Sequence, residues 1–378
     1  MSILKSRLGL GTPIPMRNRV RSIYRHLKEP VDIIAISNST DPHLDMCFFY
    51  ATGLATGLFE GSSAFLYRDG RTRILSSALE EESARKGKDP VQVFRRREHR
   101  QDLMRKALAG ARKVGINASE LTHRAFSELR KLAPAKARFI DVSEAVVLAR
   151  LVKDRDELAL LRRSCLIASE AFEEVAPRIR SGVREFEVAA DLVHTMQRKG
   201  ATGASFSTIV GSGPNSAEPH YTAGERKLRR GDFVVLDFGA TYRRYASDIT
   251  RTIVVGRASR KQREIYDTVK EAQEAALAKM RSGVPGKDVD TAARSVIDSS
   301  PYKGTFIHGL GHSIGLAVHD GGGLNQASTL TLSKDMVFTN EPGIYVSGYG
   351  GVRIEDDILI TDGRPRFLTT ATRDLVEV

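Results

Sequence analysis

Short blocks of apolar and polar positions follow one another along residues 1–150, with periods that alternate between those of strands and of helices. Apolar or alternating runs predict strands over residues 31–37, 91–94, 113–116 and 138–142. Residues 63–76 predict a hairpin that turns at Asp69 and Gly70. Helical spacing predicts helices over residues 16–27, 98–109 and 119–132, with Ser119 available as the cap of the last one. We therefore expect an α/β domain over residues 1–150.

After residue 150 the pattern changes to longer amphipathic helices that precede strands, and this order occurs twice. The first set comprises helices over residues 156–175 and 185–199, a strand over 205–210 and a hairpin over 233–255. The second set comprises helices over residues 261–280 and 286–297, followed by strand-rich segments to the end of the chain. Two such units of about 100 residues indicate an internal duplication. We expect one α+β domain over residues 151–378, with a site where its halves meet.

Length and composition agree with a soluble protein of two domains. The chain has 378 residues, more than one ordinary core holds, and 41% hydrophobic and 28% charged residues are typical of globular proteins. Its apolar runs fall short of the roughly 20 residues that span a bilayer, so we expect no membrane partner. With only two cysteines, Cys47 and Cys165, we expect neither a disulfide framework nor a thiolate cluster, which favours a cytoplasmic location.

The net charge of +12 raises the question of an anionic partner. The excess comes from arginines dispersed along the chain, without a run of five or six like charges, so we expect no nucleic-acid partner. Residues 1–28 are basic and contain no acidic residue, as in transit peptides, but Gly9, Gly11, Pro13 and Pro15 would interrupt the amphipathic helix of such a peptide. We favour a lead-in segment before an ordinary helix.

The hairpin over residues 233–255 holds two acidic residues on faces that are otherwise apolar or neutral. Asp237 shares its face of the first strand with Phe233 and Val235, and Asp248 shares its face of the second with Thr250. A buried carboxylate is costly unless something pairs with it, and two that face each other also repel. A bound metal cation would resolve both problems.

The second half of the domain supplies more groups that bind metals. Residues 304–320, GTFIHGLGHSIGLAVHD, contain three histidines among glycines, namely His308, His312 and His319. Glu341 ends an apolar strand, and Arg353, Glu355 and Asp357 alternate along a strand predicted over residues 350–360. Four carboxylates and one imidazole can hold two divalent ions about 3.5 to 4 Å apart with a bridging hydroxide.

Each of these residues also has an ordinary structural explanation. Asp248 alone would be typical of a turn or a solvent face, and Glu355 beside Arg353 could form a plain ion pair. The five residues together, at the ends of apolar strands in matching halves, predict a dinuclear metal site.

Four motifs in order resemble one family. DFGATYRRYASD, HGLGHSIG, NEPGIY and GGVRIEDD resemble those of the pita-bread metallopeptidases, which include methionine aminopeptidase, aminopeptidase P, prolidase and creatinase. The resemblance extends from residue 151 to the C-terminus. It implies a pita-bread (creatinase/aminopeptidase) fold with an internal pseudo-two-fold duplication. Residues 1–150 resemble the creatinase-like N-terminal domain of prolidase and aminopeptidase P, which supports the enzyme, mediates dimerisation and forms part of the site wall.

The resemblance also implies roles for nine residues. The metal ligands would be Asp237, Asp248, His312, Glu341 and Glu355. Glu341 would also carry protons, and His220 and His319 would be the other catalytic residues and would contact the substrate, with His308 and Arg353 nearby. Oxygen-rich ligation favours two Mn²⁺ ions, although Co²⁺ or Zn²⁺ would suit the same site. After His319 the chain reads HDGGGLN, where prolidases of this family often have HExP.

The implied activity is metal-dependent hydrolysis of bonds involving proline. The substrates would be Xaa-Pro dipeptides, as for a prolidase, or peptides that begin with Xaa-Pro, as for an aminopeptidase P. We expect a homodimer, the commonest oligomer. Two alternatives are a creatinase- or ectoine-hydrolase-like enzyme that cuts a C–N bond in a small metabolite, and an inactive binding module. Creatinase lacks the full metal set and inactive relatives typically lose ligands, so the five intact positions favour the peptidase.

Overall fold

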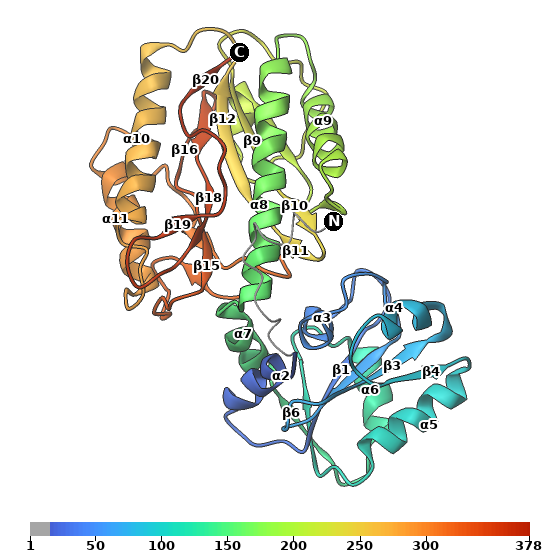
Figure 1. The fold of residues 1–378 in the computed structure, drawn as a ribbon. Helices are drawn as coiled ribbons and strands as arrows, with labels where there is room; N and C mark the ends of the chain where they lie inside the picture. Colours follow the sequence, from blue (N-terminus) through green and yellow to red (C-terminus); the bar gives the residue numbers. More distant parts are fainter. Residues whose placement is uncertain (1–15) are drawn as a thin grey trace, which may run out of the picture. The chain divides into compact units, whose positions relative to one another are not determined.

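The computed structural model describes residues 16–378, and the lead-in predicted before residue 16 lies outside the described residues (Figure 1). The chain divides into two compact units, Met1–Arg150 and Leu151–Val378. Each unit is described by itself below. Within the described residues, no helix is both long and apolar enough to cross a membrane.

The N-terminal unit is built on a six-stranded sheet in the order β4-β3-β2-β1-β5-β6. Its strands are β1 (Ile33–Ser37), β2 (Ser63–Leu66), β3 (Thr72–Ser77), β4 (Val91–Phe94), β5 (Lys113–Ile116) and β6 (Arg138–Asp141). β2 is antiparallel to both neighbours, and the other pairs are parallel. The helices are α2 (Met16–Arg25), α3 (Met46–Thr52), α4 (Glu81–Arg85), α5 (Arg97–Leu108), α6 (His123–Leu132) and α7 (Ser143–Leu151). The predicted α/β organisation is confirmed.

The structure of this unit differs from the predicted elements at α6 and at α3. α6 begins four residues late, because Thr122 caps it by accepting a hydrogen bond from Ala125 N at 3.2 Å, whereas Ser119 lies in the preceding turn. α3 was not predicted at all. Its sequence, MCFFYAT, is apolar on nearly every side and buried from Cys47 to Thr52, so no amphipathic period marks it.

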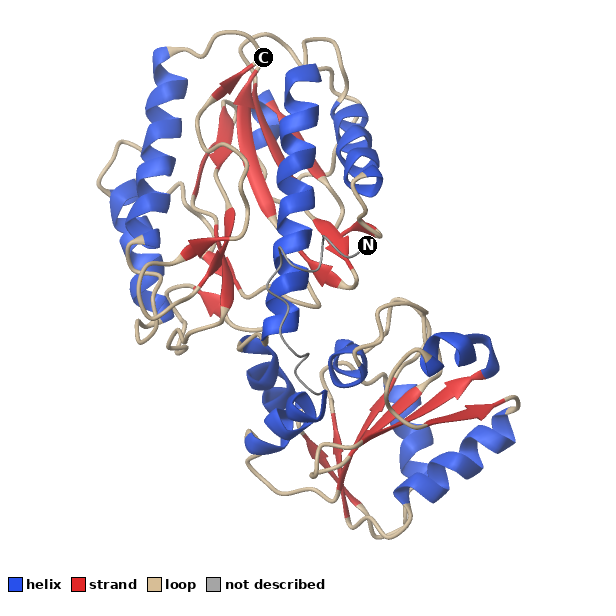
Figure 2. Cartoon of the chain, in the orientation of Figure 1, coloured by secondary structure: helices blue, strands red, loops and turns tan. Residues whose placement is uncertain are grey.

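The C-terminal unit repeats a pair of helices followed by strands (Figures 1 and 2). The helices are α8 (Arg155–Val175), α9 (Glu185–Arg198), α10 (Arg260–Leu277) and α11 (Gly286–Asp298). The longer strands are β8 (Ile209–Ser212), β9 (Phe233–Phe238), β12 (Ile249–Val254), β15 (Val337–Asn340), β16 (Gly343–Val346), β17 (Gly350–Arg353) and β18 (Asp356–Leu359). The short ones are β7 (Gly203–Ala204), β10 (Ala240–Tyr242), β11 (Tyr245–Ala246), β13 (Gly311–His312), β14 (Gly323–Leu324), β19 (Arg366–Phe367) and β20 (Val376–Glu377).

The predicted hairpin is confirmed as β9 and β12, which pair antiparallel with Asp237 opposite Thr250. One face of this pair, including Leu236 and Ile253, joins a core with residues of α8 and α9 such as Phe172. Successive side chains of a strand point to opposite faces. Because Leu236 points into this core, Asp237, which follows it, points to the opposite side of the sheet.

Two strands of this unit differ from their predictions. The strand predicted over residues 205–210 forms as β8, farther along the chain. The strand predicted over residues 350–360 is divided into β17 and β18, which belong to different sheets. At the division, Glu355 N bonds to Thr250 O at 3.1 Å, so this stretch of backbone turns from its own sheet to the edge of β12.

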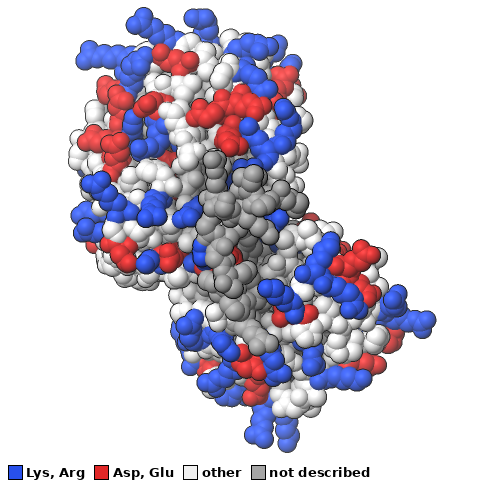
Figure 3. Space-filling view, viewed as in Figure 1, with Lys and Arg blue, Asp and Glu red and all other residues white. Residues whose placement is uncertain are grey.

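Charged side chains of both signs are interspersed on the face drawn in Figure 3. Outside the grey atoms, the blue Lys and Arg side chains of this face do not gather in one large patch. This interspersed pattern agrees with the dispersed arginines of the sequence.

Candidate metal centre

Asp237 and Asp248 meet on the inner face of the β9–β12 pair. Asp237 is opposite Thr250, and Asp248 precedes Thr250 by two residues, so both carboxylates lie on the face of Thr250. Both residues are buried, and the Asp248 backbone N–H donates to Asp357 Oδ2 at 3.0 Å. The period-two pattern thus brings two buried acids together.

His312 and Glu341 come from the second half of the unit and share one threonine. Thr339 Oγ1, on β15, accepts from His312 N at 3.0 Å and donates to Glu341 Oε1 at 3.1 Å. The Nε2 atom of His312 lies 3.4 Å from Glu341 Oε1 and 3.6 Å from Asp248 Oδ2. The imidazole therefore stands between carboxylates of both halves.

Glu355 completes the cluster at the division between β17 and β18. Thr250 Oγ1 donates to Glu355 Oε2 at 2.6 Å, which fixes that carboxylate against the hairpin. One ligand atom from each of Asp248, His312 and Glu355 lies within 4.8 Å of the other two. This spacing is suited to a metal ion.

Burial and mutual repulsion make the carboxylates costly to ionise without a cation. Burial, followed by the charges of neighbouring carboxylates, raises the pKa of Asp248 and of Glu355 well above the usual range, and burial also raises the pKa of Glu341. Among the described residues, three oxygen atoms of the cluster are buried and accept no hydrogen bond, namely Asp237 Oδ1, Asp248 Oδ1 and Glu355 Oε1. Divalent cations would satisfy these oxygens and cancel the repulsion, so the donor set fits such ions.

The protonation state of the His312 imidazole also suits it to metal binding. Burial, and then the neighbouring His319, lowers the pKa of His312 to about 4. The ring is therefore neutral at pH 7, as a metal-binding imidazole must be.

Arg353 links the cluster to a chain of hydrogen bonds. It donates to Asp237 Oδ2, to Thr250 Oγ1 at 3.0 Å and to the Tyr345 hydroxyl at 2.8 Å. The Tyr345 hydroxyl lies 2.8 Å from His308 Nε2, and His308 Nδ1 lies 2.8 Å from a backbone carbonyl oxygen. The carbonyl requires a proton on Nδ1, so Nε2 accepts from the tyrosine. Burial, then Arg353, lowers the pKa of His308 to about 4, which keeps the ring neutral.

All nine residues predicted for the site line one cavity of about 380 Å³. They are His220, Asp237, Asp248, His308, His312, His319, Glu341, Arg353 and Glu355. The rings of His312 and His319 are 4.1 Å apart, centroid to centroid, and His220 is exposed on the segment between β8 and β9. Phe206, Ile209 and Val318 add apolar wall, and Asn325 adds a polar group.

Sequence reasoning missed three residues that orient this site. Thr250 and Thr339 bind the carboxylates, and Tyr345 connects Arg353 to His308. For Thr250 a signal was present, since it shares the face of Asp248 by alternation. Tyr345 reaches Arg353 across the β16–β17 pair, and this register is not visible in the sequence.

Comparison with known proteins places this geometry in a family. The sequence model of metallopeptidase family M24 matches residues 159–362, and that of the creatinase/prolidase N-terminal domain matches residues 45–152. The chain belongs to metallopeptidase family M24. The predicted fold, an α/β domain followed by a pita-bread domain with an internal pseudo-two-fold duplication, is confirmed for this M24 member by its structural neighbours.

Its relatives include proteins named for Xaa-Pro substrates. An Xaa-Pro dipeptidase from Pyrococcus horikoshii is 38% identical over 368 residues, which cover 96% of this chain and 99% of the relative. The solved structure of an Xaa-Pro dipeptidase from Bacillus anthracis has a TM-score of 0.87 and 35% identity, covering 96% of this chain and 99% of that one. The X-Pro aminopeptidase from Thermotoga maritima MSB8 has a TM-score of 0.86 and 32% identity, with coverage of 92% and 98%.

Proposed function

We propose that this M24 metallopeptidase hydrolyses peptide bonds that involve proline, in Xaa-Pro dipeptides or at the N-terminus of Xaa-Pro peptides. The observation that carries the proposal is the cavity in which buried carboxylate oxygens without donors lie beside four histidines. Relatives that cover 92–96% of this chain include two named Xaa-Pro dipeptidase and one named X-Pro aminopeptidase.

Five side chains would hold two divalent ions in this cavity. They are Asp237, Asp248, His312, Glu341 and Glu355. Four carboxylates and one imidazole form an oxygen-rich set, for which Mn²⁺ is the favoured ion. When bound, the ions supply Lewis acidity and ionise a water molecule near neutral pH.

The two histidines on the substrate side would stabilise the developing oxyanion. His220 and His319 both line the cavity, and burial, then His220, lowers the pKa of His319. A neutral imidazole keeps one N–H donor, which can point at the carbonyl oxygen as it gains charge. In this role the histidines bind the transition state more tightly than the substrate.

Glu341 would move the proton. It lines the cavity beside His312, with Oε1 held by Thr339. In this position it can take a proton from the attacking water and deliver it to the proline nitrogen as the C–N bond breaks. The leaving group of an Xaa-Pro bond is a secondary amine, which needs this proton to depart.

Proline also explains the need for a dedicated enzyme. An Xaa-Pro bond lacks an N–H group, so peptidases that pair their substrates as extended strands bind it poorly. The apolar wall formed by Phe206, Ile209 and Val318 offers a surface for a pyrrolidine ring.

We further propose that the protein is a homodimer, the commonest oligomer. We also propose that it is located in the cytoplasm, because both cysteines are free and buried, as is typical of a reducing compartment.

The test is hydrolysis of an Xaa-Pro dipeptide and of an Xaa-Pro-Yaa tripeptide, side by side, with added Mn²⁺ and with a chelator control. Cleavage of the dipeptide alone identifies a prolidase, and cleavage of the tripeptide identifies an aminopeptidase P. Lack of cleavage of both peptides by protein loaded with metal would contradict the proposal and direct attention to other C–N bonds.

A further inference from the structure

A buried glutamate outside the cavity holds the segment that carries His220. Glu185 is the first residue of α9 and is fully buried. Its Oε1 atom accepts hydrogen bonds from Ser212 N at 2.8 Å, from Ser212 Oγ at 2.6 Å and from Asn215 Nδ2 at 3.0 Å. Its Oε2 atom accepts from the Tyr221 hydroxyl at 2.9 Å and from Gly224 N at 3.3 Å. One carboxylate thus receives five donors.

All five donors belong to residues 212–224, the segment that leaves β8 and carries His220 to the cavity wall. Tyr221 follows His220 directly, and its hydroxyl also accepts from Asn215 Nδ2 at 2.7 Å. Burial, then the hydrogen bond to Glu185, raises the pKa of Tyr221 to about 12, so the hydroxyl remains a donor. The carboxylate therefore fastens the backbone on both sides of the histidine.

The same segment has a second attachment, at its start. Ser216 Oγ accepts from Gly351 N of β17 at 2.8 Å, and β17 ends at Arg353 beside the metal cluster. This bond ties the segment to the second half of the unit, whereas Glu185 ties it to the first. His220 itself is exposed, so its placement depends on the neighbours that these bonds hold.

We propose that Glu185 is a positioning residue that acts through His220 and sets its distance from the reacting carbonyl. This inference rests on the proposed function. A glutamine has nearly the same shape, but it replaces one accepting oxygen by an NH₂ group that would face N–H and O–H donors. Glu185→Gln should therefore displace the segment without removing volume from the core. A shift of 1 Å at a catalytic group can lower the rate by about 100-fold.

The experiment is a double-mutant cycle of Glu185→Gln and His220→Ala, with kcat and KM measured on an Xaa-Pro peptide at saturating Mn²⁺. We expect Glu185→Gln to lower kcat by about 10- to 100-fold, with KM nearly unchanged, because His220 acts on the transition state. In the His220→Ala background the same change should have less than about a twofold effect, because residues that act as one unit are not additive.

Glu187→Gln is the matched control on the same helix. Glu187 is exposed, and its side chain accepts a hydrogen bond from Arg184 N at 2.6 Å, away from the segment that carries His220. The kcat of Glu187→Gln should therefore match that of the wild type. Tyr221→Phe removes only one donor and should give a smaller loss of kcat with the same dependence on His220. Equal losses in the two His220 backgrounds, or an unchanged kcat in Glu185→Gln, would overturn the inference.

Hydrogen exchange supplies a readout that does not need activity. Amides of residues 212–224 should exchange faster in Glu185→Gln, and bound metal should stay unchanged. Unchanged exchange in this segment would overturn the inference even if the wild type cleaves no Xaa-Pro peptide, an outcome that would separately refute the proposed function.

Discussion

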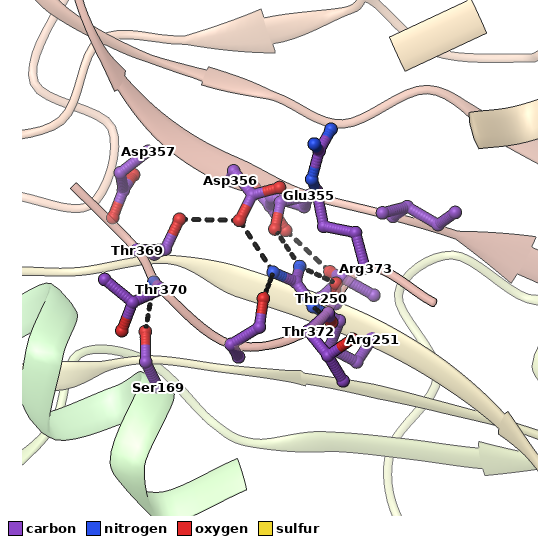
Figure 4. Close-up of polar contacts among 12 residues, drawn as sticks. Ser169, Thr250, Arg251, Glu355, Asp356, Asp357, Thr369, Thr370, Thr372 and Arg373 are labelled. Carbon is purple, nitrogen blue, oxygen red and sulfur yellow. Dashed lines mark hydrogen bonds and ion pairs between the residues drawn. The ribbon is translucent and has the colours of Figure 1, made fainter. Parts of the chain in front are cut away.

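The Arg251 side chain binds the backbone of Glu355, one of the proposed metal ligands, and its replacement gives a stability change that can be predicted from the structure (Figure 4). This residue belongs to β12, its side chain is 2% exposed, and the guanidinium donates five hydrogen bonds. The acceptors are Thr372 O at 2.6 Å, Thr250 O at 2.9 Å, Glu355 O at 2.5 Å, Ala371 O at 2.9 Å and Asp356 Oδ1 at 2.7 Å. Arg251 therefore joins β12, which begins directly after Asp248, to the backbone of Glu355 and to the C-terminal segment.

Arg251→Met keeps much of the volume and removes the charge. Asp356 is 1% exposed, and it would keep Thr369 and Gln273 as donors at 2.6 and 2.9 Å but lose its cation. Removal of one partner of a buried ion pair costs about 3–5 kcal/mol. For a domain of about 150–250 residues each kcal/mol shifts Tm by about 2–4 °C, so we expect Tm to fall by about 6–20 °C.

The assay is thermal unfolding followed by circular dichroism or calorimetry, with saturating Mn²⁺ for every variant. Arg263→Met is the matched control, since Arg263 pairs with Glu377 where the two side chains are 48% and 34% exposed. Such a pair contributes about 0–1 kcal/mol, so its loss should move Tm only slightly. If Tm of Arg251→Met stays as close to the wild type as that of Arg263→Met, the reasoning about the buried pair is wrong.

Three further predictions concern the cluster and its support. Asp248→Asn should abolish hydrolysis and lower bound metal while the circular dichroism spectrum stays that of a folded protein; full activity would contradict the dinuclear site. Lys153→Met should lower the free energy of unfolding in urea by about 3–5 kcal/mol, because Lys153 and Asp320 form a buried ion pair at 2.8 Å next to His319. The double variant Lys153→Met/Asp320→Asn should recover part of this free energy. An unchanged urea midpoint in Lys153→Met would refute the prediction. The metal-free protein should lose stability as the pH rises from about 4 to 7, because burial raises the pKa of Asp357 to about 7, that of Glu341 to about 8 and those of Asp248 and Glu355 well above the usual range, so the unfolded chain releases these protons first. The pKa values of His308 and His312, lowered to about 4, act in the opposite direction over the same range, but these two groups are outnumbered by the four carboxyl groups. Saturating Mn²⁺ should remove this trend, and a chelated protein that gains stability over the same range would contradict it.

The residues proposed as metal ligands could be singled out from the sequence because local patterns place them. Alternation along the hairpin put Asp237 and Asp248 on faces that later proved to be the buried inner face, and the glycines around His312 marked an unusual backbone. The prediction of the helix pairs succeeded for a similar reason, since each helix buries an apolar stripe, as α8 and α9 do against β9 and β12.

Charged residues that support the site could not be predicted in this way. By alternation Arg251 shares the apolar face of β12 with Ile249 and Ile253, but its partner Asp356 lies 105 positions away, so the local pattern does not show what pairs with this arginine. Glu185 resembles any acidic residue in the first turn of a helix, and its donors lie 27 to 39 positions ahead. These two residues are buried because they bind partners that are distant in the sequence, and a local pattern of apolar and polar positions does not reveal such partners.

The division of residues 350–360 into two strands has the same origin. The sequence GGVRIEDDILI alternates through the division, so it predicts one continuous strand. The backbone of Glu355 instead pairs with Thr250, and this contact exists only once the two halves have folded together. The prediction put Glu355 inside one continuous strand, whereas the structure places it between β17 and β18.

The most direct test of the central claim is a titration of metal-free protein with Mn²⁺ while hydrolysis of an Xaa-Pro peptide is followed. If Asp237, Asp248, His312, Glu341 and Glu355 hold two ions, activity should be absent without metal and should reach its plateau at two equivalents per chain. Full hydrolysis by the chelated protein, or no hydrolysis after two equivalents have bound, would contradict the account.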